Sequence, residues 1–243
     1  MFLSEIEKFI ADKNYPDFKP KAIFFDMDGV LFDSMKSHAT AWVQALEKMG
    51  LPFTEYEAYI NEGRTGASTI DGVFVQVHGR NATEDEKKQI YRTKSELFEA
   101  CGKTEPMEFA FELLEKIKSQ GFEIFVVTGS GQPTLLDSLE HNFPGIFHKE
   151  KMVTAFDVKF GKPHPEPYLI ALKKSGLQPW EVIVIENAPL GVESSNAAGL
   201  FTIGVNTGPL KPEVLSENGA SIVFGSMQEL HESWESILSS KTN

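Results

Sequence analysis

The sequence contains a single cysteine, Cys101, among 243 residues. One cysteine cannot form a disulfide within the chain, and it excludes a zinc site built from several thiolates. A catalytic thiol would need a neighbouring base and an electropositive pocket, and no residue near Cys101 in the sequence suggests either. We therefore interpret Cys101 as an ordinary thiol at the end of a helix.

Positive charge is also scarce. The chain has 23 Lys and Arg residues against 35 Asp and Glu residues, which gives a formal net charge of -12 and a pI of about 5.0. Such a chain does not attract polyanions in bulk, so we expect neither nucleic acid nor an anionic membrane as a main partner. Any phosphate group must then be bound locally, by a metal ion, a lysine or backbone amides.

Long hydrophobic runs are absent as well. No apolar stretch approaches the roughly 20 residues that cross a bilayer. Residues 1–8 carry charges in place of an apolar signal region. The sequence has no internal repeats and no low-complexity segment. We therefore expect a cytoplasmic protein that acts as a monomer.

The sequence does contain enough apolar material for a packed core, since it is 41% hydrophobic and 24% charged. Short apolar runs that predict buried strands alternate with helical patterns through most of the chain. This alternation indicates a doubly wound, Rossmann-like parallel α/β sheet with helices on both faces. The predicted strands are 22–25, 123–127, 182–185, 201–205 and 222–224, and the helices among them are 109–118, 134–141, 167–175 and one that ends at Ala198.

A different pattern interrupts the alternation early in the chain. Residues 35–103 contain helical segments, around 41–49 and 84–98, and no convincing strand. We therefore predict three parts: an N-terminal helix and linker (1–18), an α/β core (19–34 and 104–243) and an inserted helical domain (35–103).

Polar residues directly follow three of the predicted strands. Ligands of open parallel sheets bind beyond the carboxyl ends of the strands, so we expect these residues to meet at one edge of the sheet. The segments are Asp26-Met27-Asp28-Gly29, Thr128-Gly129-Ser130-Gly131 and Glu186-Asn187, with Gly161-Lys162-Pro163 in a loop between the second and the third.

Asp26 and Asp28 place two carboxylates two residues apart after a buried strand. Two carboxylates a few ångströms apart repel each other by roughly 1–4 kcal/mol, depending on the dielectric, unless a cation lies between them. Oxygen ligands of this kind favour Mg2+. Taken alone, the pair is equally compatible with a solvated turn, because Asp and Gly are common turn residues.

Together, the four segments resemble the haloacid dehalogenase superfamily, and in particular its β-phosphoglucomutase-like members. Order and spacing agree over nearly all of residues 20–225, and the resemblance implies a helical cap inserted after the first motif. The matching motifs are 26–34, then Thr128, then Lys162 within 161–168, and finally 186–192 followed by Ala197-Ala198-Gly199.

The resemblance implies a phosphoryl-transfer mechanism that the residue types permit. Asp26 would attack phosphorus and form an aspartyl-phosphate. Asp28 would act first as general acid and then as general base. Lys162 would pair with Asp26 and with the transferring oxygens. Taken alone, Lys162 would instead be a solvated loop lysine.

The resemblance places the phosphate oxygens beside the second motif. The Thr128 hydroxyl and the backbone amides near Gly129 and Ser130 would bind them. Taken alone, Thr128 would be a cap at the end of a strand, but the small residues that follow it favour the binding role.

A Mg2+ ion is implied at the same edge, with Asp26, Asp28, Glu186 and Asn187 as ligands. The fourth motif of the family usually offers two acidic residues in a row, whereas the second one here is Asn187. An amide oxygen can ligate Mg2+ but brings no charge. Metal binding is therefore weakened unless another anion compensates. The alternative explanation for Asn187 is tolerated sequence drift at this position.

Glu62, in the turn 61–66 of the inserted helices, is a candidate for that anion. In the β-phosphoglucomutase relatives this turn presents basic residues to a sugar phosphate. Here a carboxylate precedes Gly63, and Arg64 follows it out of register with the relatives' arginine. Glu62 near the metal would restore a negative charge and occupy the space of a sugar ring. Its combination with Asn187 resembles an inorganic pyrophosphatase branch of the family, and a solvated turn carboxylate is the alternative.

His38, Lys94 and Arg64 complete the candidate substrate site. His38 lies one helical turn before Trp42 and resembles a histidine that assists cap closure in the mutase relatives. Lys94 would neutralise a phosphate if its side chain points inward. Taken alone, His38 and Lys94 would be surface or packing residues.

These features favour a Mg2+-dependent phosphohydrolase that acts on a small phosphorylated substrate, with inorganic pyrophosphate as the first choice. A β-phosphoglucomutase, which is an isomerase with a roomier cap, and a broad hexose-phosphate phosphatase are the alternatives. An inactive binding module would also keep the fold, but the retained Asp26, Asp28 and Lys162 argue against it. The fold alone would not justify an activity.

Overall fold

The computed structural model describes residues 2–131 and 135–239. Thr134, the predicted first residue of a helix, lies outside the described residues. Within the described ranges, no helix is both long enough and apolar enough to cross a membrane.

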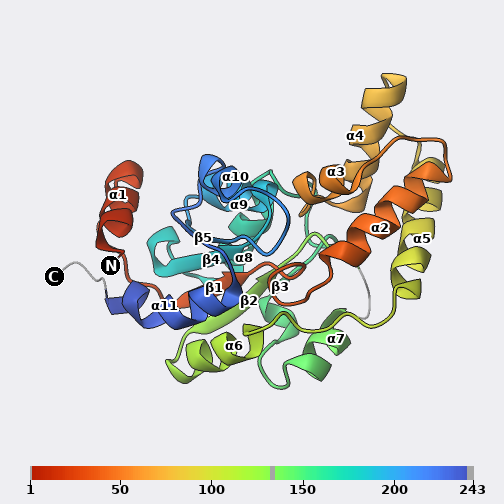
Figure 1. Ribbon diagram of the computed structural model, residues 1–243. Helices are drawn as coiled ribbons and strands as arrows, with labels where there is room; N and C mark the ends of the chain where they lie inside the picture. Colours follow the sequence, from red (N-terminus) through yellow and green to blue (C-terminus); the bar gives the residue numbers. More distant parts are fainter. Residues whose placement is uncertain (1, 132–134, 240–243) are drawn as a thin grey trace.

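A six-stranded parallel sheet forms the centre of the molecule, in the order β3-β2-β1-β4-β5-β6 (Figure 1). Because β1 lies between β2 and β4, the strand order reverses beside β1, and ligands of such sheets bind at this reversal. All five predicted strands are present, and β3 was missed because two residues show no period. The strands are β1 Ala22–Phe25, β2 Glu123–Val127, β3 Met152–Val153, β4 Val182–Glu186, β5 Phe201–Val205 and β6 Ile222–Phe224.

Alternate residues of β1 face opposite sides of the sheet. Ile23 and Phe25 belong to one apolar cluster, and Ala22 and Phe24 belong to another. Helices cover both clusters, as the alternation of strands and helices predicts. The first cluster is covered by α1 (Leu3–Lys13), α6 (Ala110–Ser119), α7 (Leu135–Asn142) and α11 (Met227–Ser239), and the second by α8 (Glu166–Ser175), with α9 (Pro189–Ala197) and α10 (Pro212–Glu217) nearby.

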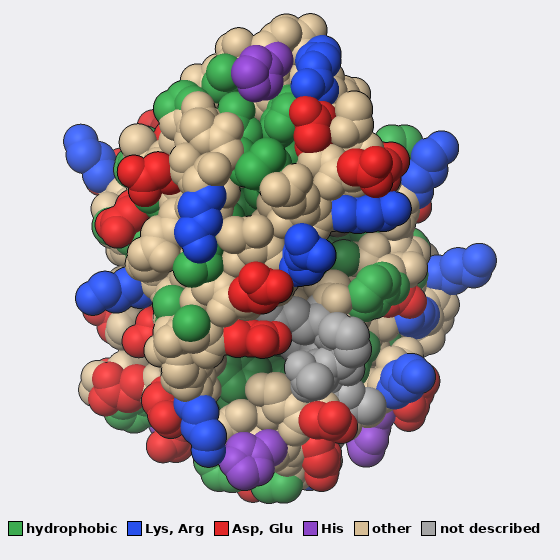
Figure 2. Space-filling view, turned by 90° about the vertical axis from the view of Figure 1, so that its right-hand side faces the viewer, with side chains coloured by type: hydrophobic (Ala, Val, Ile, Leu, Met, Phe, Trp, Pro, Cys, Tyr) green, Lys and Arg blue, Asp and Glu red, His purple; other side chains and the backbone are tan. Residues whose placement is uncertain are grey.

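Of the five helices that lie between β1 and β2 in the sequence, the first four stand beyond one end of the sheet (Figure 1). They enclose an apolar cluster of their own, which includes Leu46, Ile70, Phe74 and Ile90. Figure 2 views the molecule from this side and shows acidic and basic side chains interspersed over the surface. The helices are α2 (Met35–Glu47), α3 (Glu55–Ile60), α4 (Gly66–His78) and α5 (Glu84–Ala100).

The two chain segments that join these helices to the sheet run side by side. The Asp33 amide donates a hydrogen bond to the Glu105 carbonyl (3.0 Å), and the Met107 amide donates one to the Leu31 carbonyl (2.8 Å). Cys101, the exposed C-cap residue of α5, lies four residues before Glu105, the first residue of the second segment that makes one of these hydrogen bonds. The predicted domain boundaries at residues 34 and 103 fall beside these contacts and stay a prediction.

Some element boundaries differ from the prediction. Helix α6 begins at Ala110 and not at Phe109, because Phe109 takes a left-handed backbone conformation with φ 63°. Helix α2 begins at Met35, earlier than the pattern around 41–49 indicates. Helix α11 was not predicted, although the spacing of its buried residues carries the helical signal; these are Met227, Leu230, Trp234 and Ile237.

Candidate active site

Asp26 follows β1 directly and lies at the centre of the site. Its amide donates to the Ile185 carbonyl of β4 (2.9 Å), which continues the sheet hydrogen bonding by one residue. The side chain is buried, and Oδ1 accepts a hydrogen bond from Lys162 Nζ (2.5 Å). Burial raises the pKa of Asp26 to about 8, with Lys162 opposing the rise and the Glu186 carboxylate adding to it.

Lys162 is one of the most deeply buried side chains, with 1% of its surface exposed. Its ammonium donates to Asp26 Oδ1, to Glu186 Oε1 (2.6 Å) and to the Val127 carbonyl (2.9 Å). Burial opposes the charge, but the carboxylates of Asp26 and Glu186 outweigh it and raise the pKa of Lys162. The lysine is therefore a fixed positive charge beside Asp26.

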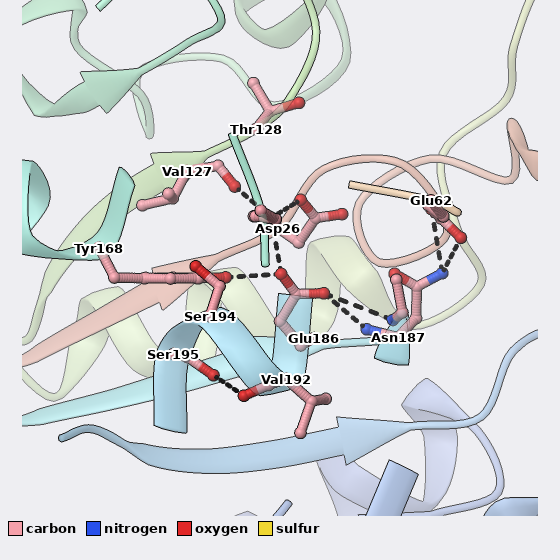
Figure 3. A network of polar contacts seen from close by, with 12 residues as sticks. Asp26, Glu62, Val127, Thr128, Tyr168, Glu186, Asn187, Val192, Ser194 and Ser195 are labelled. Carbon is pink, nitrogen blue, oxygen red and sulfur yellow. Dashed lines mark hydrogen bonds and ion pairs between the residues drawn. The ribbon is translucent and has the colours of Figure 1, made fainter. Parts of the chain in front are cut away.

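Glu186, at the end of β4, is held by donors on both carboxylate oxygens (Figure 3). Oε1 accepts from Lys162 and from the Tyr168 hydroxyl (2.6 Å), and Oε2 accepts from the amides of Asn187 (3.2 Å) and Ala188 (3.4 Å). Its side chain is fully buried. These contacts point to Glu186 as the residue that positions Lys162, and they leave its predicted role as a metal ligand a prediction.

Asp28 belongs to a second chain of polar contacts, which runs into the inserted helices α2 and α5. Its Oδ1 accepts from Ser34 Oγ (2.6 Å) and contacts His38 Nε2 (3.0 Å), and His38 Nδ1 contacts Lys94 Nζ (2.6 Å). Burial alone would raise the pKa of Asp28, but His38 and Ser34 outweigh it and lower the value to about 2. His38 stacks on Phe98 with ring centroids 4.1 Å apart.

Burial lowers the pKa of Lys94 to about 8, with Asp28 opposing the shift. Burial also lowers the pKa of His38. The Lys94 ammonium lies over the rings of Phe98 (4.9 Å) and Trp42 (5.5 Å), where cation–π attraction partly replaces water. Both side chains that were singled out in the sequence therefore point into the site.

Thr128 and the residues after it form the third side of the site. The Thr128 amide donates to the Val153 carbonyl (2.9 Å), and its hydroxyl oxygen accepts from the Ser130 amide (3.0 Å). Thr128 therefore caps the end of the strand, which is the alternative to phosphate binding that the sequence left open. It also lines the cavity, next to Gly129 and Ser130.

The turn after α3 closes the site from above. Both carboxylate oxygens of Glu62 lie 3.3 Å from Asn187 Nδ2, across the gap between the inserted helices and the sheet (Figure 3). Burial raises the pKa of Glu62 well above its usual range, and the carboxylates of Asp26 and Asp28 add to this. Arg64 is held by Asn61 Oδ1 (3.1 Å) and Ser68 Oγ (3.3 Å).

A cavity of about 70 Å³ lies between these groups. It is small beside the roughly 300–1,000 Å³ of pockets that hold drug-sized ligands. Most of the predicted site residues line it, whereas Lys162, Glu186 and Asn187 are not among its lining residues. Residues that sequence reasoning did not assign to the site also line it, including Met35, Trp42, Phe53, Thr69 and Tyr91.

The donor set fits a hard divalent cation. Asn187 Oδ1 is buried without a hydrogen-bond partner among the described residues. The carboxylates of the site also repel one another: those of Asp26, Asp28 and Glu186 raise the pKa of Glu62. No three His, Cys, Asp or Glu side chains in the described part of the chain converge as a metal-binding group. The amide oxygen of Asn187 would therefore have to complete the ligand set of Asp26 and Asp28.

The fold and the site together define a doubly wound α/β enzyme with an aspartate at the switch point and a helical insert above it. Residues 23–205 match the family described as haloacid dehalogenase-like hydrolase. The chain belongs to this family.

Similar proteins cover nearly the whole chain. Hexitol phosphatase A of Escherichia coli (strain K12) is 30% identical over 210 residues, which are 86% of this chain and 93% of that protein. Beta-phosphoglucomutase of Bacillus subtilis (strain 168) is 27% identical over 88% of this chain and 96% of that protein. A solved structure from Bacteroides vulgatus, provisionally titled beta-phosphoglucomutase, has 52% identity and a TM-score of 0.96, covering 100% of this chain and 98% of that one. The predicted fold class is confirmed.

Proposed function

We propose that the protein hydrolyses inorganic pyrophosphate through an aspartyl-phosphate on Asp26. The observation that carries the proposal is the contact of Glu62 with Asn187 at 3.3 Å, which brings a carboxylate to the mouth of the nucleophile's pocket. The remaining space of about 70 Å³ suits a compact substrate without a sugar ring. The charged groups around it suit a substrate of high charge density.

In the first step, a carboxylate oxygen of Asp26 forms a bond to phosphorus, and the bond from phosphorus to the bridging oxygen breaks. The electron pair leaves with the second phosphate, which takes a proton from Asp28. In the second step, Asp28 accepts a proton from water as the water attacks phosphorus, and the Asp26 carboxylate is released. Lys162 neutralises the charge beside Asp26 throughout.

Asp28 needs a source for the proton that it donates, since its pKa is about 2 in the free site. His38 contacts it directly, and Lys94 contacts the other ring nitrogen of His38. This chain of contacts supports a route by which a proton reaches Asp28 when a phosphate approaches and raises its pKa.

A bound Mg2+ would neutralise the carboxylates and the oxygens of the transferring phosphate. Asp26, Asp28 and Asn187 would hold it, and Glu62 would supply the charge that Asn187 lacks. Glu186 would act from behind by holding Lys162.

Hydrolysis or isomerisation of a sugar phosphate is the second candidate, because hexitol phosphatase A and beta-phosphoglucomutase are named for such activities. Arg64 also supports it, since this residue lines the cavity and its guanidinium donates hydrogen bonds to the neutral Asn61 and Ser68. Glu62 opposes it, because this residue lines a cavity of only about 70 Å³, which leaves little room for a sugar ring.

Phosphate release with Mg2+ from pyrophosphate, several hexose phosphates and β-glucose 1-phosphate tests the proposal. The last substrate is also followed for glucose 6-phosphate. We expect kcat/KM for pyrophosphate to be highest and to fall about 100-fold in Glu62→Gln, a loss of about 2.7 kcal/mol of transition-state stabilisation. Glu55→Gln, at an exposed glutamate of α3, is the matched control and should behave as the wild type.

Asp26→Asn should remove activity toward every substrate. Formation of glucose 6-phosphate without net phosphate release would show that the protein acts as a mutase and not as a hydrolase. A hexose phosphate that exceeds pyrophosphate would overturn the substrate assignment but leave the role of Asp26 intact.

A further inference from the structure

Gly161, directly before the buried lysine, lies against the turn that carries Glu62. A β-carbon at this position would lie 2.7 Å from Thr65 Cγ2 and 3.0 Å from the Thr65 backbone nitrogen. Both distances are shorter than ordinary van der Waals contact, so a side chain cannot be added without moving the turn. The backbone of Gly161 itself is not in the left-handed region, so it is the contact and not the conformation that requires glycine.

Thr65 cannot turn away to make room. Its hydroxyl caps α4 by accepting from the Ser68 amide (3.3 Å), and β-branched side chains have few rotamers. Its backbone nitrogen cannot rotate at all. A larger residue at position 161 therefore displaces the backbone at Thr65, because no flexible side chain is there to move aside.

The turn would move as one piece. The Arg64 amide donates to the Asn61 carbonyl (3.4 Å), and Arg64 Nε donates to Asn61 Oδ1 (3.1 Å), so these contacts bracket Glu62 and Gly63. A displacement at Thr65 therefore reaches Glu62, three residues earlier.

Other contacts show how closely the turn is seated on the sheet side. A β-carbon on Gly129 would lie 2.6 Å from the Gly63 carbonyl oxygen, and one on Gly63 would lie 2.9 Å from Lys162 Cδ. Lys162 is therefore flanked by backbone that admits no side chain.

We propose that Gly161 is a specificity-determining residue: by leaving room for Thr65, it sets how deeply the 61–66 turn sits and so holds Glu62 against Asn187. This inference rests on the proposed function, since it names the residue that keeps the pocket too small for a sugar ring. A turn that sits deeply against the sheet favours pyrophosphate over a hexose phosphate, and a shallower turn removes this preference.

Gly161→Ala tests this. We expect kcat/KM for pyrophosphate to fall about tenfold or more, because misplacing a group by about 1 Å costs up to about 100-fold. Activity toward a hexose phosphate should fall by less than pyrophosphate activity, or rise, because a shallower turn leaves more room for the sugar ring. Gly72→Ala is the matched control: Gly72 lies within α4, and a β-carbon there meets no atom within 4 Å.

Thr65→Ser removes the methyl group nearest Gly161 but keeps the hydroxyl cap. The double variant should therefore regain about threefold or more of the lost pyrophosphate activity, as coupled neighbours do in a double-mutant cycle. Recovery also shows that the loss in Gly161→Ala is not misfolding.

Amide hydrogen exchange of residues 61–66 gives a readout that needs no substrate. Exchange should be faster in Gly161→Ala, and slower again in the double variant. Wild-type pyrophosphate activity in Gly161→Ala, or unchanged exchange in the turn, would overturn the inference. A wild type that prefers hexose phosphates would overturn the proposed function, while faster exchange would still support the seating role of Gly161.

Discussion

Among single residues, the two carboxylates that share the Lys162 ammonium fix the positions of Asp26 and Lys162 relative to each other. Asp26 and Glu186 both accept from Nζ, at 2.5 and 2.6 Å. Glu186 is also tied to Tyr168 and to two backbone amides, so it cannot follow the lysine if the lysine moves. Glu186 therefore holds the ammonium in place beside Asp26.

Tyr168→Phe should weaken this arrangement. The hydroxyl donates to a buried carboxylate at 2.6 Å, and hydrogen bonds to charged groups contribute about 2 kcal/mol. We expect the free energy of unfolding to fall by that amount in urea titrations, and kcat to fall more than KM changes. Tyr56→Phe, at a tyrosine that is 57% exposed, is the control and should cost less than about 0.5 kcal/mol. Equal stability of the two variants would contradict the role of Tyr168.

Lys94 should make stability depend on pH in a defined window. Its pKa is about 8 in the folded protein against 10.5 for the free side chain, so the unfolded chain binds more protons between these values. The free energy of unfolding therefore increases as the pH rises through this range, by about 2 kcal/mol between pH 8 and 10. Urea titrations of the wild type and Lys94→Met across this range check it. The difference between the two proteins should change by that amount, and a constant difference would contradict it.

The polar residues that the structure brings together at the site could be predicted from the sequence, because each of them directly follows a strand or lies in a recognisable motif. Asp26, Asp28 and Thr128 are examples. Ser34 and Tyr168 were missed because their importance comes from the partner that they reach across the fold. No spacing in the sequence reveals that Tyr168 points at Glu186.

Among the secondary-structure elements, α3 bears most directly on the proposed substrate choice, because the turn that carries Glu62 follows it. The helix has only six residues and begins with a capping box in which Thr54 and Glu57 bond each other's backbone. Short helices are marginal on their own, so the cap contributes a large share of the local stability.

Thr54→Ala should therefore lower the free energy of unfolding by about 1 kcal/mol, measured by thermal denaturation. Thr54→Ser keeps the hydroxyl and should remain within about 0.5 kcal/mol of the wild type. We also expect Thr54→Ala to reduce pyrophosphate activity more than hexose-phosphate activity. An equal reduction for both substrates would show that α3 does not control Glu62.

The existence of the inserted helices could be predicted, but their arrangement could not. The charged pattern of 84–98 and its cap at Thr83 predict α5 closely. The depth at which the 61–66 turn meets Gly161 depends on contacts between segments that are far apart in the sequence, so no local pattern contains it.

For the whole molecule, the net charge of -12 governs how a substrate arrives. An anionic substrate meets long-range repulsion, which salt screens because the Debye length shortens from about 30 Å to about 8 Å between 10 and 150 mM ionic strength. We expect kcat/KM for pyrophosphate at saturating Mg2+ to rise about two- to fivefold over this range. Steady-state assays in NaCl and KCl check it. A fall in both salts would show that local attraction dominates.

The overall fold followed from the sequence because strand order along the chain, apolar runs and glycine stops all agree with one parallel sheet. The reversal of strand order beside β1 then places the site without further information.

Cys101 offers an experimental opportunity. It is exposed, it is the C-cap of α5, and it lies just before the paired segments that connect the helices to the sheet. As the chain's single thiol, it would take one fluorophore or spin label without any mutagenesis. A probe there would sit beside the two paired segments and would convert any movement of the inserted helices relative to the sheet into an optical or magnetic signal.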